Sequence, residues 1–254
     1  MIRYCCQLAY DGTDFHGFQR QAGNLRTVQS VVETVLSELQ GEEVRITGAG
    51  RTDAGVHAEG QVIHFDISRE VVPIERFVRV ANSRLPCDVS LLSVRVVPRE
   101  FHARFSATSK TYRYRIWRRE TPSPFYVRYS WHYPQELDWQ AIQTAAGLFR
   151  GKQDFAALCA AGSSVTNTVR NVARAEWIQN GDFWEFWTSA DGFLYKMVRA
   201  MVGLSVEVGR GFLRLSDLEQ ILQNKKRERR IYSAPPHGLC LMQVDYSFQE
   251  TLDV

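Results

Sequence analysis

The chain has 254 residues, of which 44% are hydrophobic and 23% charged, a composition typical of a globular protein with one large or two medium domains. The net charge of +3 is too small to indicate a nucleic-acid-binding protein by itself. Five cysteines without a CxxC pair argue against a zinc or disulfide framework. With neither a signal peptide nor an apolar run of membrane length in view, we expect a reduced cytoplasmic protein.

The first predicted strand, IRYCCQLAY at residues 2–10, leads into the polar, turn-rich loop DGTDFHGFQRQAGN. A helix is predicted to begin after Thr27, because threonine is a good N-cap and valines and leucines follow at helical spacing. Gly41 is expected to end this helix.

Residues 48–60, GAGRTDAGVHAEG, are too rich in glycine for the interior of a helix or strand. The flanking segments EEVRIT and QVIHFD both look like strands, so the stretch is predicted to be a loop between them. It contains Arg51 and Asp53, and binding and catalytic groups are common in such loops. From the residues alone, Asp53 is also typical of a turn aspartate that accepts hydrogen bonds from nearby backbone amides.

A helix near Pro73 and a strand near residues 89–97 complete a first half with the order strand, helix, strand, strand, helix, strand. This order favours an α+β fold with a mainly antiparallel sheet. A second half follows, with a helix after Asp138, a hairpin turn at Asn180-Gly181, a helix within residues 190–203 and a closing strand, LCLMQVDYSF. We therefore predict two similar subdomains, residues 1–104 and 105–254.

Basic residues are concentrated in two segments. Seven of them lie between Arg99 and Arg119, against one acidic residue, and residues 225–230 read KKRERR. Within the first segment Tyr112 and Tyr114 are predicted to share one strand face, with Arg113 and Arg115 on the other. Such a pattern can stack on bases and hold phosphates, but a solvated edge strand explains it equally well.

Several of these stretches together resemble the tRNA pseudouridine synthase A (TruA) family. The core motif GRTDAGVHA, followed by GQVIHFD, matches without a gap, and YDGTDFHGFQRQ, FHARFSAT with its YRY run, FLYKMVR and APPHGL occur in the family's order. The resemblance spans nearly the whole chain. It implies the pseudouridine synthase fold: α+β, two related subdomains with mainly antiparallel sheets flanked by helices, and an active cleft between them.

The resemblance also implies an activity, the isomerisation of uridine to pseudouridine at tRNA positions 38, 39 and 40. By resemblance Asp53 is the essential catalytic residue, and Arg51 helps to flip out the target and fill its place. Tyr112 binds the substrate by packing against the target base, and Arg199 pairs with the catalytic carboxylate. Whether Asp53 attacks the sugar or assists proton removal is left open by the sequence.

The expected partners are the anticodon arm of tRNA and a second copy of the chain, because the family is homodimeric. The reaction conserves the atoms of the uridine, so we expect no cofactor and no metal. A metal-dependent hydrolase built on His57, His64 and Asp66 is disfavoured, because their spacing fits neither the HExxH motif nor the HxE…PCxxC deaminase signature. A non-catalytic RNA-binding module is the alternative, and the intact RTD sequence argues against it.

Overall fold

The computed structural model describes residues 1–162, 165–226 and 231–247. Its contacts divide the chain into two compact units. Unit 1 contains residues 1–108 and the chain from Cys240 onward, and unit 2 contains residues 109–239. The division at residue 104 that we drew from the sequence stays a prediction of domain organisation.

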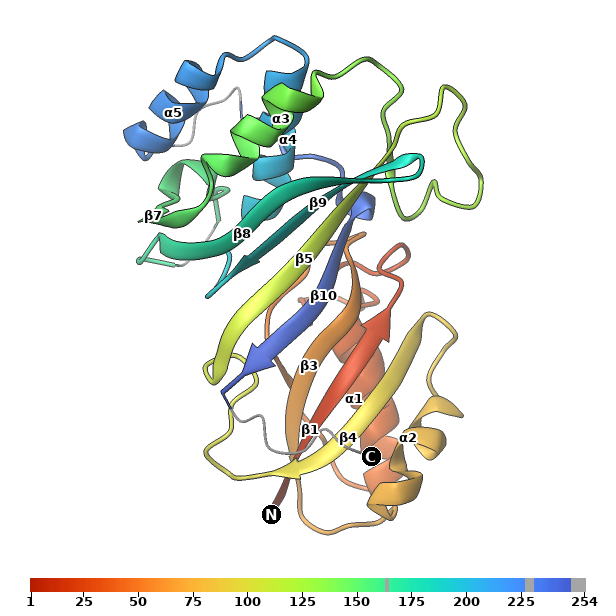
Figure 1. Ribbon diagram of the computed structural model, residues 1–254. Coiled ribbons are helices and arrows are strands. Elements are labelled where there is room, and N and C mark those ends of the chain that lie inside the picture. Colours follow the sequence, from red (N-terminus) through yellow and green to blue (C-terminus); the bar gives the residue numbers. More distant parts are fainter. Residues whose placement is uncertain (163–164, 227–230, 248–254) are drawn as a thin grey trace. The chain divides into compact units, whose positions relative to one another are not determined.

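Unit 1 contains a sheet with the strand order β4–β1–β3–β10 (Figure 1). Its strands are β1 (Ile2–Tyr10), β3 (His57–Ile67), β4 (Val89–Val97) and β10 (Leu239–Tyr246). Neighbouring strands are antiparallel except β3 and β10, which run parallel, with Cys240 opposite His57 and Leu241 opposite Ala58. The first and last parts of the chain therefore build one sheet together.

Helices α1 (Val28–Gln40) and α2 (Ile74–Asn82) belong to the same unit, and α1 lies behind the sheet in Figure 1. The predicted limits of α1 are confirmed. Thr27 accepts a hydrogen bond from the amide of Ser30, and Gly41 has a φ of 67°, the left-handed conformation that ends many helices. Valines and leucines of α1 are buried at helical spacing, as their pattern indicated.

The prediction of a strand over EEVRIT, residues 42–47, is wrong except at Thr47, because strand β2 comprises only Thr47–Gly48. Val44 and Ile46 are buried, which gives the alternating pattern of a strand. Their backbone groups bond side chains of α1 instead of a neighbouring strand. The Val44 amide donates to Ser37 Oγ (2.9 Å), and the Ile46 amide donates to Glu33 Oε1 (3.1 Å).

Unit 2 contains a sheet with the order β5–β9–β8–β7 (Figure 1), all antiparallel. The short strand β6 pairs in parallel with β5. The predicted hairpin is confirmed, with Gly181 at a φ of 58° between β8 and β9. The elements of this unit are β5 (Ala107–Trp117), β6 (Trp131–His132), α3 (Trp139–Gly147), β7 (Gly151–Asp154), a 3-10 turn (Ala156–Leu158), β8 (Val169–Asn180), β9 (Phe183–Ala190), α4 (Met197–Gly209), α5 (Leu215–Asn224) and a second 3-10 turn (Pro236–Gly238).

Helix α4 starts later than the sequence predicted. We expected a helix within residues 190–203, but it begins at Met197 and continues to Gly209. Lys196, directly before it, has a φ of 60°, which a right-handed helix cannot contain. Leu194 is buried although it precedes the helix, so its apolar side chain extended the helical pattern in the sequence.

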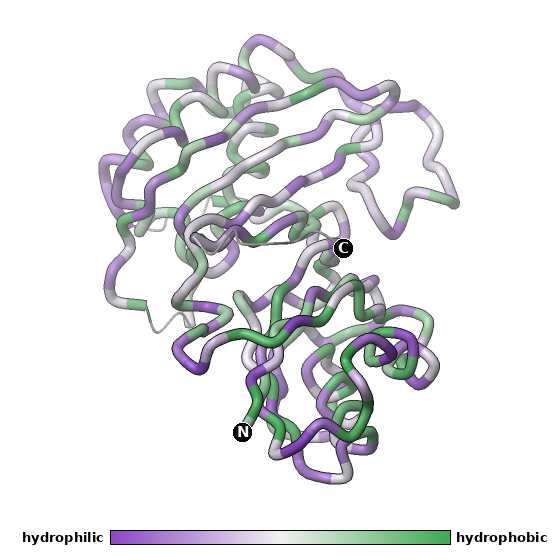
Figure 2. Tube along the Cα trace, turned by 60° about the horizontal axis from the view of Figure 1, so that its bottom comes forward, coloured by the Kyte–Doolittle hydropathy of each residue, from purple (hydrophilic) through white to green (hydrophobic). Residues whose placement is uncertain are grey.

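Both units have apolar interiors, and hydrophilic and hydrophobic residues alternate over short distances along the chain (Figure 2). Among the described residues, no helix is long and apolar enough to cross a membrane. The predicted α+β class with mainly antiparallel strands is confirmed.

Candidate active site

The glycine-rich stretch forms a tight turn in unit 1 that ends where β3 begins, at His57. The Asp53 carbonyl accepts a hydrogen bond from the Val56 amide (3.1 Å), and Gly55 has a φ of 77°. Asp53 is half-buried and Arg51 is exposed. Gly60, which we assigned to the loop, lies inside β3.

The loop that follows β1 lies directly against the Asp53 turn. Gly17 has a φ of 91°, and a Cβ atom there would come within 2.9 Å of the Thr52 carbonyl oxygen. A Cβ atom on Gly12 would lie 2.0 Å from the Val56 carbonyl oxygen. The Phe18 amide donates a hydrogen bond to the Thr52 carbonyl (3.0 Å). Glycine at these two positions therefore permits the close approach of the two loops.

A buried polar cluster supports the turn from the sheet. The hydroxyls of Tyr10 and Thr52 are 2.8 Å apart, and Gln61 Nε2 donates to the Gly50 carbonyl (3.0 Å) and to the Tyr10 hydroxyl (3.4 Å). Burial raises the pKa of the Tyr10 hydroxyl, so it stays neutral and available for hydrogen bonding. Our sequence reasoning missed Tyr10 and Gln61, because a polar residue in a strand gives no sign of which loop it supports.

The side chain of Arg51 is also held in place, although it is exposed. Its Nε donates a hydrogen bond to Gln19 Oε1 (3.0 Å), from the loop after β1. Arg51 and Asp53 thus lie on one turn whose backbone and side chains are both bonded to neighbouring elements of unit 1.

The three residues considered as metal ligands have different protein partners. The Nδ1 atoms of His57 and His64 accept hydrogen bonds from the amides of Gly12 (2.9 Å) and Ala103 (3.1 Å), respectively. Asp66 accepts two bonds of 2.8 Å from Arg3. No group of three or more histidine, cysteine, aspartate or glutamate residues suited to a metal occurs in the described part of the chain.

Tyr112 and Arg199 belong to unit 2. Tyr112, in β5, is 7% exposed, and its ring meets Phe193 edge-on with centroids 5.2 Å apart. Arg199, in α4, is half-buried, and its Nε donates to the Ala234 carbonyl (2.7 Å) while its own carbonyl accepts from the Ala234 amide (2.9 Å). Arg199 is therefore fixed to the chain segment before β10, unlike a typical solvated arginine on a helix surface.

The two basic segments contain several arginines and lysines with acidic partners. Arg115 pairs with Glu185 (2.8 Å), Arg119 with Asp182 (2.7 Å) and Lys225 with Asp154 (3.7 Å). Residues 227–230 of the KKRERR run lie outside the described residues.

Comparison with known proteins shows the family to which the chain belongs. A family model described as tRNA pseudouridine synthase matches residues 8–106 and 145–247. The chain belongs to this family. Among curated relatives, tRNA pseudouridine synthase A of Methylacidiphilum infernorum is 45% identical over 97% of this chain and 96% of its own length. The proteins of that name from Moorella thermoacetica and a Geobacillus strain are 47% and 41% identical, over 94% and 96% of this chain and 97% and 98% of theirs.

These matches confirm the predicted family and the predicted isomerisation of uridine to pseudouridine in tRNA. The chain is a tRNA pseudouridine synthase, an isomerase that converts uridine to pseudouridine. Among solved structures, a crystal structure of a Cbf5-Nop10-Gar1 complex matches with a TM-score of 0.32 and 13% identity, over 80% of this chain and 54% of the other.

Proposed function

We propose that this tRNA pseudouridine synthase acts on uridines 38, 39 and 40 of the anticodon arm, with Asp53 as its catalytic carboxylate. The observation that favours this role is that two neighbouring elements hold the Asp53 turn in place. The loop after β1 packs against the Thr52 carbonyl, and the Tyr10 hydroxyl bonds the Thr52 side chain. A carboxylate on a turn held from two sides is preorganised, as a catalytic group must be.

The reaction breaks the bond between C1′ and N1 of the uridine, rotates the uracil and joins C1′ to C5. The C5 proton is lost and N1 gains a proton, so no atoms are added overall. Asp53 contributes either by attacking C1′ or by removing a proton from the sugar. In both routes the carboxylate has to be ionised and close to the ribose.

The target base must leave the helical stack, which costs a few kcal/mol. Arg51 is two residues from Asp53 and exposed, which supports the proposal that it enters the position that the base vacates. The roles of Tyr112, against the uracil, and of Arg199, as partner of the catalytic carboxylate, rest on the family resemblance alone. So does the homodimer. The cytoplasmic location rests on the sequence, and the absence of a cofactor rests on the conservation of atoms in the reaction.

The test uses unmodified tRNA with tritium at uridine C5, and measures the tritium released to water in the presence of EDTA. The wild type should release tritium, while Asp53→Asn should bind the tRNA and release none. Glu59→Gln, at an exposed position in β3 close to the turn, is the matched control and should keep the wild-type rate.

Each outcome separates two readings. Release by Asp53→Asn would exclude the catalytic role of Asp53 but keep the enzyme. Binding without release by the wild type would favour a non-catalytic RNA-binding module. Carbodiimide labelling followed by reverse transcription maps the modified positions, and stops outside 38–40 would contradict the proposed substrate site. Light scattering of the purified protein tests the homodimer.

A further inference from the structure

A chain of side-chain hydrogen bonds connects Arg51 to a buried carboxylate on α1. Arg51 Nε donates to Gln19 Oε1 (3.0 Å), and Gln19 Nε2 donates to Gln29 Oε1 (2.7 Å). Gln29 Nε2 in turn donates to Glu33 Oε1 (2.9 Å). The four residues come from three segments: the Asp53 turn, the loop after β1 and helix α1.

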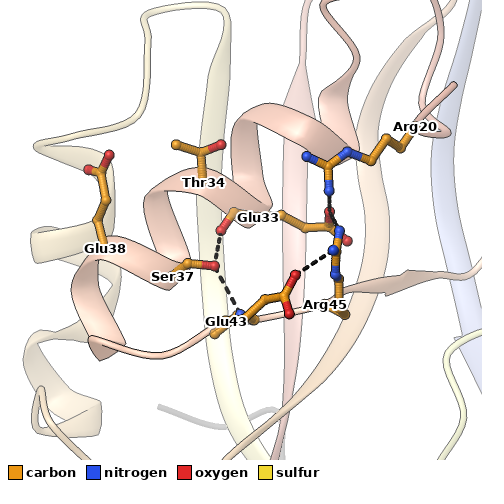
Figure 3. Close-up of a pocket in the computed structure, with 8 residues that line it drawn as sticks. Arg20, Glu33, Thr34, Ser37, Glu38, Glu43 and Arg45 are labelled. Carbon is orange, nitrogen blue, oxygen red and sulfur yellow. Dashed lines mark hydrogen bonds and ion pairs between the residues drawn. The ribbon is translucent and has the colours of Figure 1, made fainter. Parts of the chain in front are cut away.

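Glu33 is the fixed end of this chain. It is 4% exposed, although glutamate is rarely buried unless it is paired. Its Oε2 accepts from Arg20 and Arg45 (both 3.3 Å), and its Oε1 accepts from Gln29 and from the Ile46 amide (3.1 Å). Figure 3 shows both arginines converging on Glu33. The three residues line a hollow of about 290 Å³. The carboxylate therefore has four donors and a single defined position.

The carboxylate of Glu33 determines the donor–acceptor direction of every hydrogen bond between it and Arg51. A carboxylate only accepts, so Gln29 must turn its NH₂ group toward Glu33 and its carbonyl away. The Arg20 amide, which only donates, bonds that same carbonyl (2.9 Å) and fixes its orientation. Gln19 must then present its NH₂ group to Gln29, which leaves its carbonyl facing Arg51. Arginine Nε is a donor, so a flipped Gln19 amide would leave it without this acceptor.

We propose that Gln19, Gln29 and Glu33 are positioning residues that orient the Arg51 guanidinium for its part in the reaction. The inference rests on the role proposed for Arg51. The bond to Gln19 uses Nε on the inner edge of the guanidinium and not its two terminal nitrogens, which make bidentate contacts with phosphates and bases. An exposed arginine loses rotamer freedom when it inserts into RNA, and prior orientation lowers this cost.

The experiment measures single-turnover tritium release at saturating tRNA, with the tRNA Kd and the Tm of each variant recorded beside it. Gln19→Met keeps the length of the side chain and removes the acceptor. It should slow release about tenfold, as expected for one lost hydrogen bond to a charged group, with Kd and Tm unchanged. Gln19→Glu still accepts from Arg51 and should recover most of the rate. Gln21→Met, exposed in the same loop and bonded to the His16 carbonyl instead, should match the wild type.

A double-mutant cycle tests whether Gln19 acts through Arg51. In an Arg51→Ala background, Gln19→Met should cause no further loss, because its partner is already gone. An equal further loss there, or a wild-type rate for Gln19→Met alone, would overturn the inference. A wild-type rate for Arg51→Ala would overturn the role of Arg51 and the inference together. Release of tritium by Asp53→Asn concerns the proposed function alone.

A second pair of variants tests Glu33, the end of the hydrogen-bond series that lies away from Arg51. Glu33→Gln removes the carboxylate and presents an NH₂ group either to the two arginines or to Gln29, so one set of donors loses its acceptor and the fixed end of the hydrogen-bond series is weakened. It should slow single turnover in the same direction as Gln19→Met, and again not in the Arg51→Ala background. Glu38 lines the same hollow, and the control variant Glu38→Gln should leave the rate unchanged. Equal rates for both variants would show that the buried end does not orient Arg51.

Discussion

The side-chain hydroxyls of Tyr10 and Thr52, which are 42 residues apart in the sequence, are hydrogen-bonded at 2.8 Å in the interior of unit 1. Tyr10→Phe removes this bond next to Asp53 and leaves the Thr52 hydroxyl buried. We expect a loss of about 1 kcal/mol in the free energy of unfolding and a drop in kcat of about tenfold, because the turn loosens. Urea unfolding and tritium release measure the two effects.

Tyr246→Phe is the control for this variant. It also removes a tyrosine hydroxyl bond in unit 1, from Tyr246 to the Ala103 carbonyl (2.7 Å), but does not touch the Asp53 turn. It should lower stability and keep kcat. Equal effects of the two variants on kcat would contradict a specific support of the turn by Tyr10.

Gly17→Ala should impair catalysis beyond its cost to stability. Both Gly17 and Gly23 have a positive φ, 91° and 85°, so alanine at either position is strained by about 1 kcal/mol. Only at Gly17 would the new Cβ press on the Thr52 carbonyl, whereas nothing lies within 4 Å at Gly23. We expect similar Tm losses from strain, with a further loss and a lower kcat for Gly17→Ala. Equal kcat values for Gly17→Ala and Gly23→Ala would rule this out.

His64 should make stability depend on pH between about 4 and 6.5. Burial, together with the charges of Arg3 and His102, lowers its pKa from 6.5 to about 4. The unfolded chain binds the proton first as pH falls, so the stability contributed by neutral His64 is complete above pH 6.5 and is lost toward pH 4. The stability difference between wild type and His64→Gln, measured by urea unfolding, should therefore shrink as pH falls from 7 to 4.5. Parallel curves would refute this.

Gly60→Ala should destabilise the pairing of β3 with β10. A Cβ atom at Gly60 would lie 2.2 Å from the Met242 carbonyl oxygen, which is backbone and cannot rotate away. We expect a loss of roughly 1–3 kcal/mol, measured by urea unfolding. Gly147→Ala, at the end of α3 with nothing within 4 Å of the new atom, should be neutral or slightly stabilising. If Gly60→Ala left the free energy of unfolding unchanged, β10 would have to shift away from the new atom without destabilising the protein.

Features set by neighbouring residues were predictable from the sequence. Thr27 and Gly41 bound α1 as expected, because capping depends on residues within one turn. The Asn180-Gly181 hairpin is another local signal. The turn around Asp53 was recognisable for the same reason, since its glycines and its RTD sequence are contiguous.

Features that depend on distant partners were not predictable. EEVRIT has the apolar alternation of a strand, but its backbone bonds Ser37 and Glu33 of α1, and nothing in the segment shows this. Gln19 and Gln29 read as polar residues of a loop and a helix. Their connection to Arg51 needs the packing of three segments. The sequence of β10 likewise contains no sign that its partner is β3.

The pairing of β10 with β3 has a consequence for synthesis on the ribosome. Strands β1, β3 and β4 emerge early and can pair with one another, but the edge of β3 at His57 and Ala58 waits for the strand that starts at Leu239. All of unit 2 is translated in between, which takes on the order of ten seconds. An open strand edge is prone to pair with other chains during that delay. Strand β10, although it is made after all of unit 2, thus completes a sheet whose other strands come from the first hundred residues.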